Sequence, residues 1–190
     1  MDDRTPDGEL IKRYLKGDEK SFAVLYGRYR LQLYAYLSRR VSCQADADDL
    51  FEECWLRVIK NLDRYQDDGI FGAWLLRVAR NLWLDRLRSD RRSRMSVPLD
   101  DADAVPVEPA APEKDRPDRV SSADELAELV RGALDELRPE LREVFVLRQE
   151  NRPFREIAEI QNCSINTVLS RMQYALKFLR RRLRSYRSTM

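Results

Sequence analysis

Apolar residues recur every three or four positions along most of this chain, which is the spacing of helices with one buried face. One such stripe lies within residues 18–41 and consists of Phe22, Leu25, Tyr26, Tyr29, Leu33, Tyr36 and Leu37. A second stripe begins near Ile70 and consists of Phe71, Trp74, Leu75, Val78 and Leu82. Further helices are predicted over about 7–17 and 45–62, with Asp7 as the N-cap of the first. Four helices with apolar faces predict a compact N-terminal unit.

Two segments interrupt the helical pattern. Residues 63–69 (DRYQDDG) form a short polar loop, whereas residues 95–120 are acidic and hold five of the eight prolines. The second segment has no apolar stripe and is predicted to be an extended linker. Helices resume near Ser121 and continue to about Arg184, with a pause at Pro139. The predicted fold is all-α, with two small helical domains and a flexible linker between them, over residues 1–94, 121–190 and 95–120 respectively.

Residues 153–184 carry the pattern of a helix-turn-helix, a motif whose second helix enters the major groove of DNA. Asn162 stands where the chain must turn, and Asn tolerates a left-handed backbone. Ser164 is a suitable N-cap for the second helix. The apolar faces of the two helices consist of Ile157, Ala158 and Ile160, and of Ile165, Val168, Met172, Ala175 and Leu179.

The other side of the second helix carries residue types that read base edges or bind phosphates. Asn166, Ser170, Gln173 and Lys177 lie on this side. Thr167 and Tyr174 flank it, and Arg171 lies nearer the border of the core. No acidic residue follows Glu159, so the C-terminal end is strongly basic. A solvated face of an ordinary helical hairpin is the alternative, but the turn residues and the basic flank together favour DNA binding.

The charges are distributed unevenly. Charged residues make up 36% of the 190 residues, yet the net charge is only +2. Residues 77–94 and 171–190 are basic, and residues 99–118 are mostly acidic. Two basic patches indicate two contacts with a polyanion. There is no apolar run that could span a membrane and no signal-peptide pattern, so a cytoplasmic protein without membrane insertion is expected.

The sequence offers no catalytic site. It contains no His, which excludes Ser-His-Asp and Cys-His catalysis and every zinc site that uses His. Its three Cys lack CxxC spacing, and its 6 Gly form no phosphate-binding loop. We therefore expect a binding protein that is not an enzyme and that has neither a cofactor nor a bound metal.

Two segments resemble regions 2 and 4 of the extracytoplasmic-function (ECF) subfamily of bacterial sigma factors. The first is DADDLFEECWLRVIKNLDRY followed by FGAWLLRVARNLWLDRLR, and the second is LRPELREVFVLRQENRPFREIAEIQNCSINTVLSRMQYALKFLR. The opening DGELIKRYLKGDEKSFAVLYGRYRLQLYAYL fits as well, so the resemblance covers all but the linker. Two motif sets in the right order are far more specific than a lone helix-turn-helix. The resemblance implies a factor that directs core RNA polymerase to specific promoters and initiates transcription.

The resemblance also implies a role for each surface. The third helix would bind the clamp helices of the largest polymerase subunit through Asp46, Asp49, Glu52, Glu53 and Arg57. The flap of the polymerase would be a further contact. The loop and the fourth helix would recognise and melt the −10 element through Tyr65, Asp67, Arg77, Arg80, Asn81 and Arg88. The second domain would read the −35 element through Arg155, Asn166, Thr167, Ser170, Arg171, Gln173 and Tyr174. Many subfamily members are held inactive by an anti-sigma factor, which is a candidate third partner.

Four positions depart from the subfamily pattern. Pro153 stands in place of Ser or Thr, Asn162 in place of Gly, Leu169 in place of Lys, and Glu52 in place of Gln. The departures at Leu169 and Glu52 bear on the details of promoter and polymerase contacts. Trp83 and Leu87 lie opposite the apolar stripe of their helix and are expected to pack on the first helix, with coverage by another protein as the alternative.

Simpler interpretations exist for each surface and for the whole chain. The acidic third helix could merely compensate a helix dipole, and the basic fourth helix could be a solvated face. A stand-alone regulator whose N-terminal helices dimerise or bind a ligand is a second function, and a helical scaffold with a vestigial helix-turn-helix is a third. Binding to core polymerase would discriminate the first function from the second, and weak salt dependence of DNA binding would favour the third.

Overall fold

The structure is a computed structural model that describes residues 5–41, 43–95 and 122–187. Within these ranges it is entirely helical, which confirms the predicted all-α class. The N-terminal domain contains α1 (Asp7–Leu15), α2 (Glu19–Ser38), α3 (Gln44–Asn61), the 3-10 turn η1 (Leu62–Arg64) and α4 (Phe71–Met95). The C-terminal domain contains α5 (Ser122–Asp135), α6 (Pro139–Gln149), α7 (Phe154–Gln161) and α8 (Ile165–Arg187). Most of the predicted linker, residues 96–120, lies outside the described ranges.

The first two helices are joined by a tight turn with a side-chain cap. Gly17 adopts a φ of 99°, a left-handed conformation that favours glycine. Asp18 then accepts hydrogen bonds from the Lys20 backbone N–H (3.1 Å) and the Ser21 hydroxyl (2.7 Å), and the bond from Ser21 lowers the pKa of Asp18. The predicted cap of α1 is wrong, because Pro6 is the N-cap and the Asp7 carboxylate instead accepts hydrogen bonds from α2.

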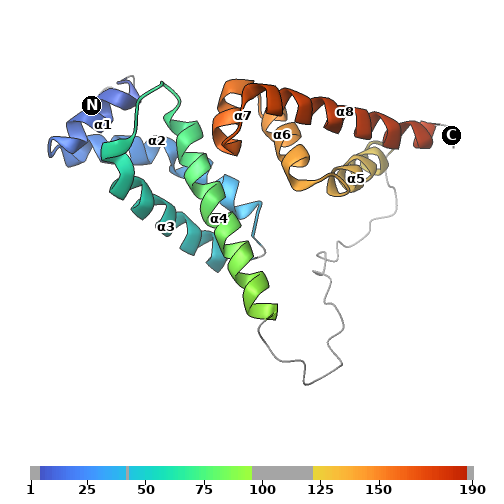
Figure 1. The fold of residues 1–190 in the computed structure, drawn as a ribbon, viewed down its shortest axis with the longest axis horizontal. Coiled ribbons are helices and arrows are strands. Elements are labelled where there is room, and N and C mark those ends of the chain that lie inside the picture. Colours follow the sequence, from blue (N-terminus) through green and yellow to red (C-terminus); the bar gives the residue numbers. More distant parts are fainter. Residues whose placement is uncertain (1–4, 42, 96–121, 188–190) are drawn as a thin grey trace.

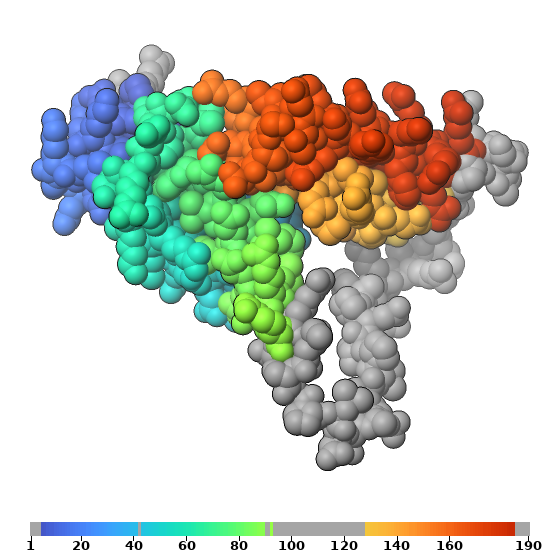
Figure 2. All heavy atoms as spheres, viewed as in Figure 1, coloured from blue at the N-terminus to red at the C-terminus, as the bar shows by residue number. Residues whose placement is uncertain are grey.

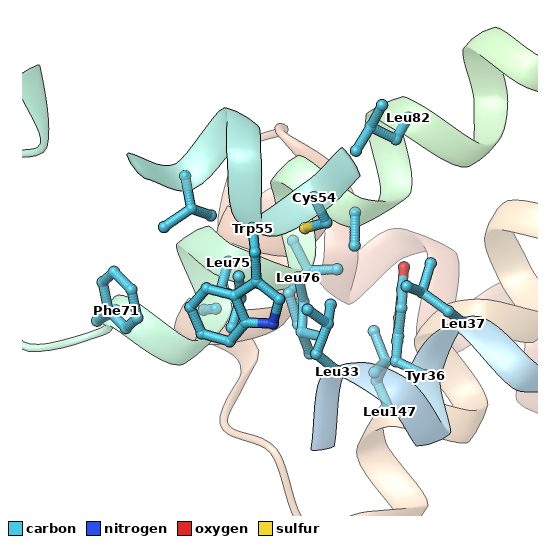
Figure 3. Close-up of a cluster of buried hydrophobic side chains, with 14 of the residues drawn as sticks. Leu33, Tyr36, Leu37, Cys54, Trp55, Phe71, Leu75, Leu76, Leu82 and Leu147 are labelled. Atoms are coloured by element: carbon cyan, nitrogen blue, oxygen red, sulfur yellow. The ribbon is translucent and has the colours of Figure 1, made fainter. Parts of the chain in front are cut away.

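The core of the N-terminal domain lies between α2, α3 and α4 (Figure 3). Its fully buried side chains include Leu33, Leu37, Leu50, Cys54, Val58, Phe71 and Leu75. The Trp55 ring is also buried, with its centroid 5.0 Å from that of Tyr26 and 5.8 Å from that of Phe22. Burial raises the pKa of the Cys54 thiol to about 12, so this cysteine is an inert core residue.

In the C-terminal domain, α5 and α6 pack against the long α8 (Figure 1). Helix α6 begins at Pro139, because proline suits the first helical position. Val168, Ala175 and Leu179 of the predicted apolar stripe are buried, as expected. Ile165 is an exception and is exposed, because it lines an open pocket of about 310 Å³ between the helix-turn-helix and the loop before α4.

The two domains are packed against each other. Helix α7 packs on α4, and the space-filling view shows the C-terminal domain in contact with the N-terminal domain at this place (Figures 1 and 2). One apolar cluster runs through both domains and joins Val144 and Leu147 of α6, with Ile157 of α7, to the core of α2 and α4. Figure 3 shows Leu147 with Tyr36 and Leu37 of α2. The sequence pattern predicted both domains but not this docking.

Candidate nucleic-acid and polymerase interface

The helix-turn-helix has the turn chemistry that the sequence predicted. Asn162 is left-handed, with φ 49° and ψ 53°, and it ends α7. The Cys163 N–H donates to the Ala158 carbonyl at 3.0 Å, which closes the end of α7. The Ser164 hydroxyl accepts the Thr167 N–H at 3.1 Å, so Ser164 caps the start of α8. These bonds fix the angle at which α8 leaves the turn.

The predicted −35 residues on α8 fall into two groups. Asn166, Ser170, Gln173 and Tyr174 are exposed, and they leave an open polar surface on α8. Thr167 and Arg171 instead bond to the turn. The Thr167 hydroxyl lies 2.9 Å from the Ser164 hydroxyl, and the Arg171 guanidinium donates to Gln161 Oε1 at 2.6 Å.

The loop before α4 is held by aromatic packing and by the start of α1. The Tyr65 ring lies 5.5 Å from that of Phe71 and 4.9 Å from that of Trp74, and burial raises the pKa of Tyr65. Asp67 Oδ1 accepts the Gly69 N–H at 3.1 Å. A Cβ atom placed on Gly8 would lie 1.7 Å from Asp67 Oδ2, so the Asp67 carboxylate rests directly on the glycine backbone of α1. This support of the loop could not be predicted from the sequence.

The predicted −10 residues of α4 do not share one open surface. Asn81 and Arg88 are exposed, and Arg88 pairs with Asp85 at 3.0 Å. Arg77 and Arg80 face the C-terminal domain and pair with Glu159 (2.8 Å) and Glu143 (2.9 Å).

The next turn of α4 contacts the end of α2. Trp83 donates its indole N–H to the Arg40 carbonyl at 3.1 Å, beyond the last residue of α2. The sequence predicts that Trp83 packs on the first helix, whereas this hydrogen bond places its indole against the segment after α2.

Helix α3 presents an outward face with acidic and apolar residues. Asp46 and Asp49 lie 2.5 and 3.6 Å from the Arg86 guanidinium of α4, and Glu53 pairs with Arg57 at 2.8 Å. Glu52 is exposed beside them. Leu56 is 57% exposed and Ile59 is 38% exposed on the same face. Sequence reasoning missed these two apolar residues, although their positions outside the buried Leu50, Cys54 and Val58 stripe could have identified them.

Comparison with known proteins identifies the family. The Sigma-70 region 2 model matches residues 25–93, and the Sigma-70, region 4 model matches residues 127–179. The ECF RNA polymerase sigma-E factor of Escherichia coli K12 is 30% identical over 178 residues, which cover 90% of this chain and 91% of that protein. The chain belongs to the ECF RNA polymerase sigma factors. The RNA polymerase sigma-H factor of Pseudomonas aeruginosa is 27% identical and covers 87% of this ECF factor.

Two solved structures share the fold of this ECF sigma factor. The sigma factor RpoE of Bartonella quintana, in complex with the anti-sigma factor NepR, has a TM-score of 0.61 at 22% identity and covers 87% of this chain and 98% of its own. CnrH, in complex with the cytosolic domain of CnrY, has a TM-score of 0.63 at 23% identity and covers 95% of this chain and 99% of its own.

Membership of the family establishes what the protein does. ECF sigma factors direct promoter-specific initiation of transcription, and they are DNA-binding regulators, not enzymes. Their two sigma domains bind core RNA polymerase and promoter DNA. None of the helices within the described ranges is long and apolar enough to cross a membrane.

Glu143 of this ECF factor is a residue that sequence reasoning did not identify. Only 9% of its side chain is exposed, and it accepts hydrogen bonds from Tyr36 (2.9 Å), Arg40 (2.8 Å), Arg80 (2.9 Å) and Gln161 (2.9 Å). Burial alone would raise the pKa of Glu143, but Arg40 and Arg80 outweigh burial and hold this pKa below its ordinary value of 4.5. Glu143 is therefore an ionised carboxylate at the contact between the two domains.

Proposed function

We propose that this sigma factor divides its work among three surfaces. The outward face of α3 binds core polymerase, the loop before α4 and α4 itself act on the −10 element, and α8 reads the −35 element. The observation that carries the proposal is the capped helix-turn-helix, whose second helix leaves Asn166, Ser170 and Gln173 open to a DNA groove. The region 2 match, which includes all of α3 and most of α4, supports the other two assignments.

The polymerase-binding surface consists of the acidic residues of α3 together with Leu56 and Ile59. Apolar side chains at the centre of a charged rim are typical of protein interfaces. Asp49 and Glu53 are exposed, so their reversal should not disturb the core. The pair Asp49→Lys and Glu53→Lys should weaken binding to core polymerase by roughly tenfold or more, because it places like charges across the interface.

Competition with labelled wild-type protein for core polymerase measures this effect. The control is the pair Glu128→Lys and Asp135→Lys in α5, which changes the net charge equally on another exposed surface. The control should compete like the wild type. Equal competition by both double variants would show that α3 does not carry the polymerase contact.

The two DNA-reading surfaces should be separable in a promoter library transcribed by the reconstituted polymerase. Ser170→Ala should change preference within the upstream element only, by about 1–3 kcal/mol for each lost base contact. Asn81→Ala should affect only the downstream element and the opening of the duplex. Arg88 and the exposed Tyr174 belong to the same two surfaces. A uniform loss over the whole library, the same for both variants, would contradict separate readout.

We also propose a cytoplasmic location and an anti-sigma factor as a third partner. Transcription takes place in the cytoplasm of bacteria, where the family acts. The structure of Bartonella RpoE with NepR supports the proposal of an anti-sigma factor. Affinity capture from cells with and without crosslinking tests this partner, with core polymerase subunits as the internal reference.

A further inference from the structure

At the contact between the two domains, three hydrogen-bond donors converge and form a binding site for an anion. Its donors come from the N-terminal domain and are the Tyr36 hydroxyl, the Arg40 guanidinium and Arg80 Nε. The Arg40 guanidinium also lies 3.4 Å above the Tyr36 ring centroid, which fixes its direction. The side chains of Arg40 and Arg80 are only 17% and 13% exposed. Two nearly buried guanidinium groups converging on one point require an anion.

Glu143 of the C-terminal domain fills this site. One of its carboxylate oxygens accepts from Tyr36 and Arg40, and the other accepts from Arg80 and from Gln161 of its own domain. Both oxygens are therefore satisfied, and three of the four donors belong to the opposite domain. A buried charge without a partner is costly. The three donors and the Glu143 carboxylate therefore fix the position of one domain relative to the other.

The same contact occupies several groups that we assign to DNA. Arg80 is bound to Glu143, Arg77 pairs with Glu159 at 2.8 Å, and Arg155 donates to the Asp68 carbonyl at 3.4 Å. Gln161 continues the chain of bonds to Arg171 of α8. Carboxylates and a carbonyl thus stand where phosphate oxygens would be bound. A guanidinium that donates to a carboxylate offers the same hydrogens to a phosphate.

We infer that Tyr36, Arg40 and Arg80 form an oxyanion site with two exclusive occupants, Glu143 when the domains are docked and a promoter phosphate when they are apart. Glu143 then occupies the phosphate site in the free protein and prevents this site from binding DNA. The inference rests on the proposed assignment of Arg80 to promoter DNA. Separation of the domains removes Glu143 and makes the site available.

Removal of the Glu143 charge tests the docked state directly. Glu143→Gln keeps the shape of the side chain but loses the ion pairs, so the domains should separate and the radius of gyration in solution X-ray scattering should increase. Amide exchange of α4 and α7 should become faster at their contact face. Arg40→Gln, which removes one of the two guanidinium groups that pair with Glu143, should have the same effect. An unchanged radius and unchanged exchange in both variants would overturn the inference.

Whether docking of the domains prevents DNA binding is tested by measuring DNA binding in the absence of polymerase. The probes are fluorescent 30-mers of random sequence, single-stranded and duplex, because phosphate contacts do not depend on sequence. Glu143→Gln should bind them roughly tenfold more tightly than wild type if the docked form predominates by that factor. Glu136→Gln is the matched control, since it loses the same charge from an ion pair with Arg182 inside one domain. Equal affinities of Glu143→Gln and Glu136→Gln would show that docking does not prevent DNA binding.

A third measurement separates this inference from the proposed function. Arg80→Gln is assayed for transcription by the reconstituted polymerase on a promoter that the wild type uses. Wild-type activity would show that Arg80 does not contact promoter DNA, which overturns the −10 assignment and with it the second occupant of the site. Reduced activity, combined with a Glu143→Gln protein that stays compact, would leave the −10 assignment standing and overturn the docking role of Glu143.

Discussion

Gly72 lies where the start of α4 meets the ring of Tyr29. A Cβ atom at this position would lie 2.8 Å from Tyr29 Cε1 and 3.5 Å from Cδ1. The ring is half-buried and its hydroxyl is bound to Asp7, so it cannot move away freely. Gly72→Ala should therefore lower the free energy of unfolding by about 1–3 kcal/mol, as overpacking does elsewhere. Urea denaturation followed by circular dichroism measures the change.

Gly27 provides the control for this prediction. It lies inside α2, and a methyl group added to it would have no neighbouring atom within 4 Å outside its own helix backbone. Gly27→Ala should raise the free energy of unfolding by about 0.4–1 kcal/mol, because alanine restricts the unfolded chain more than glycine does. Stabilisation by both substitutions would show that α4 and Tyr29 are not in close contact.

At the scale of single residues, the sequence predicts correctly those features that depend on residues close by in the chain. Asn162 and Ser164 could be assigned from the sequence because a left-handed turn residue and an N-cap act on neighbours within three positions. Asp7 was assigned wrongly because its carboxylate bonds to Arg28 and Tyr29, which only the fold brings near. The contact of Asp67 with Gly8 joins segments that no local rule connects.

At the scale of elements, helix α3 makes the clearest prediction. Leu56 and Ile59 are exposed without a partner in the core, so Leu56→Gln and Ile59→Gln together should leave the free energy of unfolding within about 0.5 kcal/mol. The same double variant should bind core polymerase several-fold more weakly if the apolar centre of the interface is lost. Competition for core polymerase and urea denaturation together measure both effects.

Leu31 is the matched control for this element. It is 72% exposed on α2, so Leu31→Gln makes the same chemical change on a different helix. Its competition for core polymerase should equal that of the wild type. A stability loss above about 1 kcal/mol in the α3 variant would instead assign Leu56 and Ile59 to packing within the domain.

The helices themselves were predictable because their apolar positions repeat with the helical period. In the stripes of α2 and α4, seven of the twelve predicted residues are buried, and the other five are partly buried against the same core. Ile165 fits the stripe of α8 but is exposed, because the first turn of α8 projects into the pocket beside the loop before α4. The period of the apolar residues predicts which face of a helix is buried. It does not predict how far along that face the neighbouring helix extends.

At the scale of the whole molecule, the docking of the two domains was beyond sequence reasoning. Glu143 meets Arg80 across 63 residues of chain and Tyr36 across 107 residues. Such pairs leave no periodic signal, and a charged residue in a sequence is ordinarily read as exposed. The family resemblance described the domains one by one, so it also gave no reason to expect this contact.

The docked state should depend on pH in the acidic range. The pKa of Glu143 is lowered in the folded protein, so its contribution is complete above its ordinary value of 4.5 and is lost as the pH falls through the lower folded pKa. Burial raises the pKa of Tyr36, so its hydroxyl remains a donor in this range. The radius of gyration should be constant from about pH 6 to 8 and should increase below about pH 4.5. Expansion already near about pH 6.5 would contradict this role of Glu143.

The burial of Glu143 has a consequence for the response of the protein to ionic strength. With only 9% of its side chain exposed, the carboxylate is shielded from dissolved ions, and buried pairs are screened far less than exposed ones. The binding of arginine side chains to DNA phosphates depends instead on the release of counterions and weakens steeply as the salt concentration rises. A rise in ionic strength should therefore weaken the DNA-bound form while leaving the docked form nearly unchanged. Ionic strength alone should then shift this sigma factor toward its docked form.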